Sequence, residues 1–175
     1  RSHGITKDLK IKSSNSGSWY YEMHDLGFNY RITDFQCALG FNQLKKLNKF
    51  LKRRREIAEI YNSKFKNKSF ITVPKINKNC KHAFHLYPLR INFDQLGISK
   101  KKLFKKLNKK KINLQVHYIP IHLQPFYKKK LGFKEGDFPV AEQFYKDEVS
   151  LPIYFSLQNK QVYKTIKYLS QMIGI

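Results

Sequence analysis

The sequence predicts an α+β fold in which helices cover a small sheet. Two observations favour this class. Apolar residues recur at helical spacing in several separate stretches, the longest of which is 33–66. Only two short segments, 84–93 and 112–118, have the composition of strands. Helices interleaved with few strands are typical of an α+β sandwich, and 175 residues with 41% apolar content suffice for one domain, or one domain plus a piece of another.

The first helix is predicted to begin at Thr33. Thr33 and Gln36 have the spacing of a capping box, and Asp34 places a negative charge in the first turn. Apolar residues then follow at a spacing close to 3.6. One helix over 33–66 would be long for a globular protein, so we expect two consecutive helices that meet near Asn48.

The other elements are predicted from local signals. Residues 1–28 are rich in Ser, Gly and aromatic residues, which indicates a loop with room for a short strand, and residues 67–82 form a polar connection. Pro88 favours an edge position for the strand at 84–93. The remaining predicted elements are a Lys-rich helix capped by Ser99, a strand at 112–118, a helix from Pro139 to about Glu148, an extended segment at 150–152 and a helix at about 159–172.

The formal net charge of +23 suggests a basic nucleic-acid-binding module as an alternative function. However, only six of the 35 basic residues are Arg, the residue that binds phosphates and bases in bidentate fashion. Lys is abundant together with Asn, Ile, Phe and Tyr, which share AT-rich codons. The Lys triplets at 100–102, 109–111 and 128–130 are therefore interpreted as solvated surface, although a basic field for a nucleotide diphosphate also fits.

Other features point to a cytoplasmic protein. Cys37 and Cys80 are too isolated to suggest a disulfide framework. No run approaches the roughly 18 apolar residues of a membrane-spanning helix. The chain begins with neither an apolar signal stretch nor a Met, so we expect Arg1 to be a cut end.

Three clusters of side chains are candidates for chemistry. Asn29 and Arg31 lie just before the capped helix, where an anion site or simple turn geometry would both fit. The run 117–122, which contains two His and one Tyr, follows a predicted strand, where such residues bind a sugar, relay a proton or stay structural. Cys80, His82 and His85 lack a second cluster at matching spacing, so we expect no metal site.

Several short motifs occur in order along the chain. They are RSHGI at 1–5, LGFNYRITDFQ at 26–36, ALG at 38–40, RREIA at 54–58, HYIPIH at 117–122 and SLP at 150–152. Together they resemble the DegT/DnrJ/EryC1/StrS sugar-nucleotide aminotransferases. The segments 19–22, 116–125 and 136–142 are most similar to one branch, the UDP-4-amino-4,6-dideoxy-N-acetyl-β-L-altrosamine transaminases of pseudaminic acid synthesis.

This resemblance implies a type I, aspartate aminotransferase-like fold that uses pyridoxal 5′-phosphate (PLP). Residues 1–48 would be the tail of the large PLP-binding domain, a loop plus a helix, and residues 49–175 the C-terminal small domain, a small antiparallel sheet covered by helices. The family's cofactor lysine precedes the RSHG motif. We therefore expect this chain to lack that lysine, to hold no PLP by itself and to be inactive alone.

The resemblance also implies partners and residue roles. The complete enzyme would be a cytoplasmic homodimer that transfers an amino group from L-glutamate to a UDP-linked 4-keto sugar for a surface polysaccharide or glycan. Asn29 would reach the cofactor phosphate across the dimer interface, and an amide can donate to phosphate without adding charge. No residue of this chain is assigned as catalytic. The residues expected to bind substrate are Arg31, His117, Tyr118, His122 and, more weakly, Tyr21.

Overall fold

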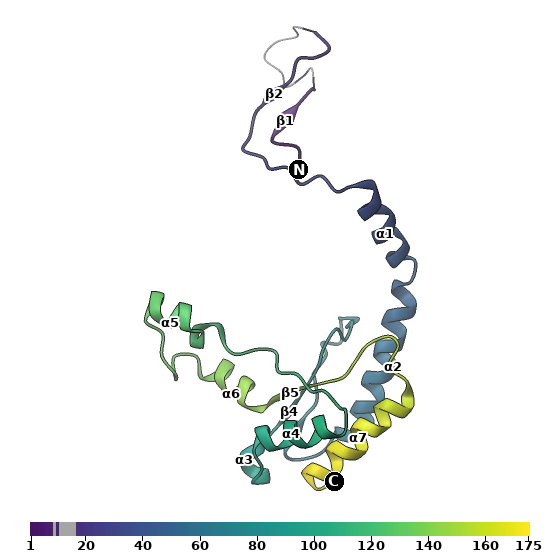
Figure 1. Ribbon diagram of the computed structural model, residues 1–175, viewed down its shortest axis with the longest axis vertical. Helices are drawn as coiled ribbons and strands as arrows, with labels where there is room; N and C mark the ends of the chain where they lie inside the picture. The colour runs from purple at the N-terminus through teal and green to yellow at the C-terminus, as the bar shows by residue number, and fades with distance from the viewer. Residues whose placement is uncertain (9, 11–16) are drawn as a thin grey trace. The chain divides into compact units, whose positions relative to one another are not determined.

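The computed structural model describes residues 1–8, 10 and 17–175 (Figure 1). Part of the loop predicted over residues 1–28 thus lies outside the described residues. The chain divides into two compact units, Arg1–Leu47 and Asn48–Ile175.

The first unit contains a short ribbon and one helix. Strand β1 (Ile5–Thr6) pairs antiparallel with β2 (Glu22–Met23). Helix α1 (Asp34–Leu44) begins with the predicted capping box, which is confirmed: the Gln36 amide N–H donates to the Thr33 hydroxyl, and the Gln36 side chain accepts from the Thr33 N–H. None of the described residues of this unit is buried, so a hydrophobic core does not fix its shape.

Close contact between main-chain segments fixes the ribbon instead. The His3 N–H donates to the Phe28 carbonyl at 3.1 Å. A Cβ atom on Gly27 would lie 2.1 Å from the Gly4 nitrogen, far inside van der Waals distance, and Gly4 has a φ of +68°. Both positions therefore require glycine.

The second unit is built on a three-stranded antiparallel sheet in the order β3 (Ile71–Thr72), β4 (Tyr87–Ile91), β5 (Glu148–Leu151). Ile71 pairs with Ile91, and Leu89 pairs with Val149. The predicted edge position of β4 is wrong, because β4 is the central strand. Pro88 is tolerated there because β3 pairs only with Arg90 and Ile91 and does not reach Pro88.

Three helices pack on this sheet around one core. They are α2 (Leu47–Phe65), α4 (Lys100–Lys109) and α7 (Asn159–Ile173). The core joins side chains of α2, α4 and α7 to the inward-facing residues of β4 and β5. Its largest fully buried members are Tyr61, Tyr87, Phe65, Ile57, Leu89, Ile91, Leu103, Leu107, Leu169, Val149 and Val162. The predicted α+β class, a small antiparallel sheet covered by helices, is confirmed.

Four shorter helices complete the second unit: α3 (Phe93–Leu96), the 3₁₀ helix η1 (Ile121–Leu123), α5 (Pro125–Leu131) and α6 (Pro139–Asp147).

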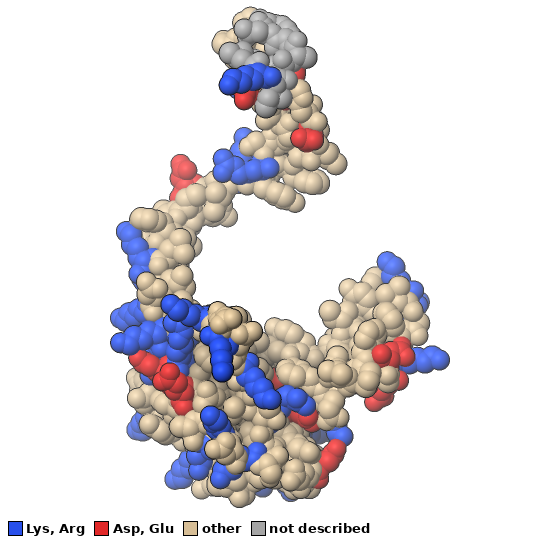
Figure 2. All heavy atoms as spheres, turned by 180° about the vertical axis from the view of Figure 1, so that it is seen from behind, with Lys and Arg blue, Asp and Glu red and all other residues tan. Residues whose placement is uncertain are grey.

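Lys and Arg side chains are spread widely over the face in Figure 2, with acidic side chains between them. Within the described part of the chain, no helix is both long enough and apolar enough to cross a membrane.

Several predicted boundaries differ from the structure. The break in the long helix falls at Lys45 and Lys46, between the end of α1 and the start of α2, rather than at Asn48. The strand predicted at 112–118 is reduced to one bridge, between Gln115 and Ser150. The helix from Pro139 stops one residue before Glu148, because residues 148–151 join the sheet as β5. Helices α3 and α5, η1 and the two-residue strand β3 were not predicted.

Two polar side chains connect α2 to the segment after β5. Arg54 Nη1 donates to the carbonyls of Phe84 at 2.9 Å, His85 at 3.1 Å and Ile153 at 3.0 Å. The fully buried Tyr61 donates its hydroxyl to the Pro152 carbonyl at 2.8 Å. These bonds hold the exit of β5 against the helix.

We expect Tyr61→Phe to destabilise the fold. The substitution keeps the buried ring but leaves the Pro152 carbonyl without its donor, which costs about 1 kcal/mol or more in the free energy of unfolding. Tyr163, which is 56% exposed on α7, provides the matched control, and Tyr163→Phe should have a negligible effect. Urea unfolding of the three proteins measures the difference; equal stability of all three would contradict the role given to this bond.

Candidate functional site

The candidate residues fall into separate groups, and one group lies in the first unit. Asn29 Oδ1 accepts from Arg31 Nε at 3.0 Å, and Arg31 Nη2 lies 3.2 Å from His3 Nε2. An antiparallel bridge between Ser2 and Asn29 holds the two segments together. The sequence prediction did not include His3 in this group, although His3 belongs to the RSHG motif.

The hydrogen bonds of this group leave donors available. Both bonds to the Asn29 side chain use its oxygen, so its amide N–H₂ has no partner among the described residues. Asn29 and Arg31 are exposed, and Arg31 lies two residues before the N-cap Thr33 of α1. An amide donor and a guanidinium beside a helix N-terminus can together bind an anion such as a phosphate.

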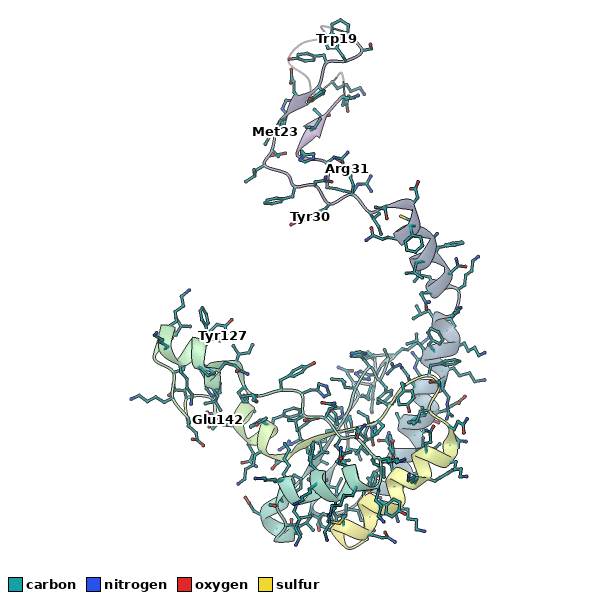
Figure 3. The ribbon with its side chains drawn as sticks, viewed as in Figure 1. Trp19, Met23, Tyr30, Arg31, Tyr127 and Glu142 are labelled. Atoms are coloured by element: carbon teal, nitrogen blue, oxygen red, sulfur yellow. The ribbon has the colours of Figure 1, made fainter. Side chains whose placement is uncertain are left out.

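Tyr21 lies apart from these bonds. Its side chain is 55% exposed and directly precedes β2. It forms no hydrogen bond with Asn29 or Arg31 in the described part of the chain. Figure 3 labels Met23 on β2 and, on the segment that follows β2, Tyr30 and its neighbour Arg31.

A second group lies in the other unit, around Glu148. This residue is fully buried at the start of β5. Its Oε2 accepts from the His117 backbone N–H at 3.0 Å, and its Oε1 accepts from the Ser150 hydroxyl. Ser150 Oγ also lies 2.8 Å from His117 Nδ1. The half-buried imidazole of His117 is thus connected to a buried carboxylate through one hydroxyl.

Tyr118 is the most exposed of the predicted substrate residues in this unit, at 73%. Its ring meets the His117 ring edge-on, with centroids 4.7 Å apart. Tyr118 also lines an apolar hollow of about 620 Å³. The other residues that line this hollow are Pro120, Asp137, Phe138, Pro139, Val140, Ala141 and Phe144.

His122 is not exposed in the same way. Its ring is 6% exposed, and its Nε2 lies 2.8 Å from Glu142 Oε1. Glu142 also accepts from the Gly136 N–H at 2.9 Å, and the Phe138 ring packs 4.7 Å from the His122 ring. This pair connects η1 to α6, and His122 as a substrate residue stays a prediction.

The hydrogen bonds lower the pKa of Glu142. The largest cause is the bond from His122, followed by the bond from the Gly136 N–H.

The remaining candidate, Cys80 with His82 and His85, brings no ligands together: His82 Nδ1 accepts from the Phe84 N–H at 3.0 Å. No group of three or more potential ligands lies close enough to hold a metal ion in the ranges 1–8 and 17–175.

The sequence prediction missed Glu148 and treated Ser150 only as part of a motif. The signal that could have found Glu148 is its place in EVSL, an acidic residue inside a short apolar strand. Such a residue is buried only when it is hydrogen-bonded, so its partners are expected nearby. Its position two residues from Ser150 puts both side chains on the same face of the strand.

Comparison with known proteins identifies the family. The DegT/DnrJ/EryC1/StrS aminotransferase family matches residues 1–170. The chain belongs to this family. It is 40% identical over 160 residues to a UDP-4-amino-4,6-dideoxy-N-acetyl-β-L-altrosamine transaminase of Campylobacter jejuni, with 91% of this chain and 40% of that protein covered.

Solved structures agree with this assignment. Helicobacter pylori PseC, an aminotransferase involved in the biosynthesis of pseudoaminic acid, matches with a TM-score of 0.80 at 29% identity, covering 99% of this chain and 44% of that chain. The PMP-form of the putative sugar aminotransferase Spr1654 from Streptococcus pneumoniae matches with a TM-score of 0.80 at 30% identity, covering 99% and 43%. The chain thus spans less than half the length of the relatives it matches.

We expect Glu142→Gln to destabilise the arm formed by η1, α5 and α6 in a pH-dependent way. Because the folded state lowers the pKa of Glu142, its carboxylate stabilises the fold above the ordinary value of 4.5, and this contribution is lost as the pH falls below that value. The stability difference between the native protein and the Glu142→Gln variant should therefore be present near neutral pH and shrink below 4.5.

Urea unfolding at a series of pH values measures this difference. Glu135→Gln is the matched control, since Glu135 is an exposed residue in the loop that precedes α6 and makes no ion pair among the described residues. A difference for Glu142→Gln that stays constant down to about pH 3 would show that the carboxylate charge contributes nothing.

Proposed function

We propose that this chain is part of a PLP-dependent aminotransferase that transfers an amino group from L-glutamate to the keto carbon of a UDP-linked 4-keto sugar. The family match over residues 1–170 is the observation that carries this proposal. The C. jejuni relative is named as a transaminase of a UDP-linked amino sugar, and PseC as an aminotransferase involved in the biosynthesis of pseudoaminic acid. The product would enter a surface polysaccharide or glycan.

The proposed domain division follows the family. Residues 1–48 would belong to the large cofactor domain, and residues 49–175 would form the small C-terminal domain. The enzyme would be a cytoplasmic homodimer, with the phosphate of the cofactor held across the subunit interface. The lysine that holds the cofactor is proposed to lie outside this chain, so the chain alone would be inactive.

The first unit supports a role in binding the phosphate of PLP. The unpartnered amide of Asn29 can donate to a phosphate oxygen, because its oxygen is already engaged by Arg31. Arg31 keeps the amide oriented and adds positive charge that can meet the phosphate or the diphosphate of the sugar nucleotide. When bound, PLP accepts the amino group from the donor and passes it to the keto sugar.

The second unit supports contacts with the sugar nucleotide. Tyr118 offers an exposed hydroxyl and an aromatic face beside an apolar hollow. The half-buried His117 offers one ring nitrogen beyond those already bonded. His122 would act by holding the arm through Glu142. Tyr21, in the first unit, stays a weaker candidate for substrate binding.

We expect Asn29→Ala in the complete protein to weaken retention of PLP. Loss of one hydrogen bond to a charged phosphate should raise the dissociation constant by about tenfold or more. Titration followed by the visible absorbance of bound PLP measures this change. Asn42→Ala is the matched control, because it removes an exposed amide of α1 that, among the described residues, bonds only to the Ala38 carbonyl.

The activity itself is tested with glutamate and a UDP-linked 4-keto sugar, by following the formation of 2-oxoglutarate and the amino sugar. Formation that depends on both substrates and on PLP is expected for the complete protein, and none for the 175-residue chain alone. Amination by this chain alone would contradict the proposal that the cofactor lysine lies elsewhere.

A further inference from the structure

The imidazole of His117 is bonded on one side only. Its Nδ1 lies 2.8 Å from Ser150 Oγ. Its Nε2 has no hydrogen-bond partner within the described part of the chain, and the ring is half-buried. A neutral imidazole has one nitrogen that donates and one that accepts, and the bond at one nitrogen decides which is which.

Ser150 decides the role of Nδ1 because its own proton is already committed. Its hydroxyl donates to Glu148 Oε1, so its oxygen can only accept from His117. Nδ1 must then carry the proton, and Nε2 is left as an acceptor. Ser150 is 4% exposed and its hydroxyl donates a hydrogen bond to a carboxylate, so it is not placed as a nucleophile.

Glu148 fixes the direction of the hydrogen bond that it shares with Ser150, because both of its oxygens accept. Two donors converge on it, the Ser150 hydroxyl and the His117 backbone N–H. Both oxygens of Glu148 thus act as acceptors, which leaves the Ser150 hydroxyl as the donor in the bond between the two side chains.

The backbone around Ser150 is held on both sides. Ser150 pairs with Pro88 of β4, and its N–H and carbonyl exchange hydrogen bonds with Gln115 at 2.9 and 3.2 Å. The residue that sets the His117 ring therefore lies between two paired segments. Such a fixed position is what a group needs to orient another side chain.

We propose that Glu148 and Ser150 are positioning residues that fix the tautomer of His117, so that its Nε2 accepts a hydrogen bond from a hydroxyl or amide N–H of the sugar substrate. This inference rests on the proposed function for the identity of the ligand. It predicts a preference for a sugar that presents a donor at this point, since a ligand with an acceptor there would face a lone pair.

The tautomer can be measured directly in the 175-residue chain. Proton–nitrogen correlation spectra of the imidazole rings at about pH 8, where an ordinary His is neutral, distinguish a protonated Nδ1 from a protonated Nε2. His117→Gln assigns the signal. We expect a protonated Nδ1 in the native chain, a shift toward protonated Nε2 in Ser150→Ala, and recovery of the native tautomer in Ser150→Thr.

Ser170→Ala is the matched control, because Ser170 is a buried serine whose hydroxyl has no partner among the described residues. It should leave the His117 signals unchanged. Glu148→Gln should also shift His117 toward protonated Nε2. Thermal unfolding checks that each variant folds. A native His117 with its proton on Nε2, or an unchanged tautomer in Ser150→Ala, would overturn the inference.

In the complete protein, Ser150→Ala should raise the KM for the sugar nucleotide about fivefold, the effect of one neutral hydrogen bond, while kcat changes much less. Ser170→Ala should change neither. Absence of amination in every form would sink the proposed function and leave the tautomer result standing. Normal amination together with a His117 tautomer that does not change in Ser150→Ala would contradict this inference alone.

Discussion

The buried carboxylate of Glu148 is the constraint on which the second unit depends. A charge without exposure must have hydrogen bonds to both oxygens, or the fold loses more than it gains from burying it. The Ser150 hydroxyl and the His117 N–H supply these bonds. The segment that leads to the candidate substrate residues is therefore attached to β5 by this side chain together with one main-chain bridge, between Gln115 and Ser150.

This attachment explains why the strand predicted at 112–118 does not form. Ile112 and Leu114 are buried, as the pattern indicated, and Gln115 does pair with Ser150. Two residues later the Glu148 carboxylate takes the place of a strand carbonyl as the acceptor for His117. A local pattern cannot show that a side chain 31 residues away will end the pairing.

Local signals predicted what local chemistry determines. The capping box at Thr33 and the Ser99 N-cap of α4 needed only neighbouring residues, and both formed. Helix α5 also had a signal that the prediction did not use, Pro125 at its first turn and Gly132 after its last. Strand β3 has two residues, too few for any periodicity to reveal it.

The candidate site shows the same limit in another form. The motifs named Asn29, Arg31 and the 117–122 segment as chemically able residues, but not their partners. Glu142, 20 residues from His122 in sequence, engages its ring, and His3 meets Arg31 across 28 residues. Tertiary contacts therefore separate a His that is committed to packing from one that keeps a free nitrogen.

The glycine pair in the first unit has a consequence for the anion-binding group. With no buried side chain in its described part, this unit gains its stiffness where two stretches of main chain touch at Gly4 and Gly27. Asn29 lies two positions beyond that crossing and inherits its geometry. The orientation of the Asn29 side-chain amide depends on the absence of a Cβ atom at Gly4 and at Gly27. A methyl group added at either glycine would therefore change that orientation from a distance.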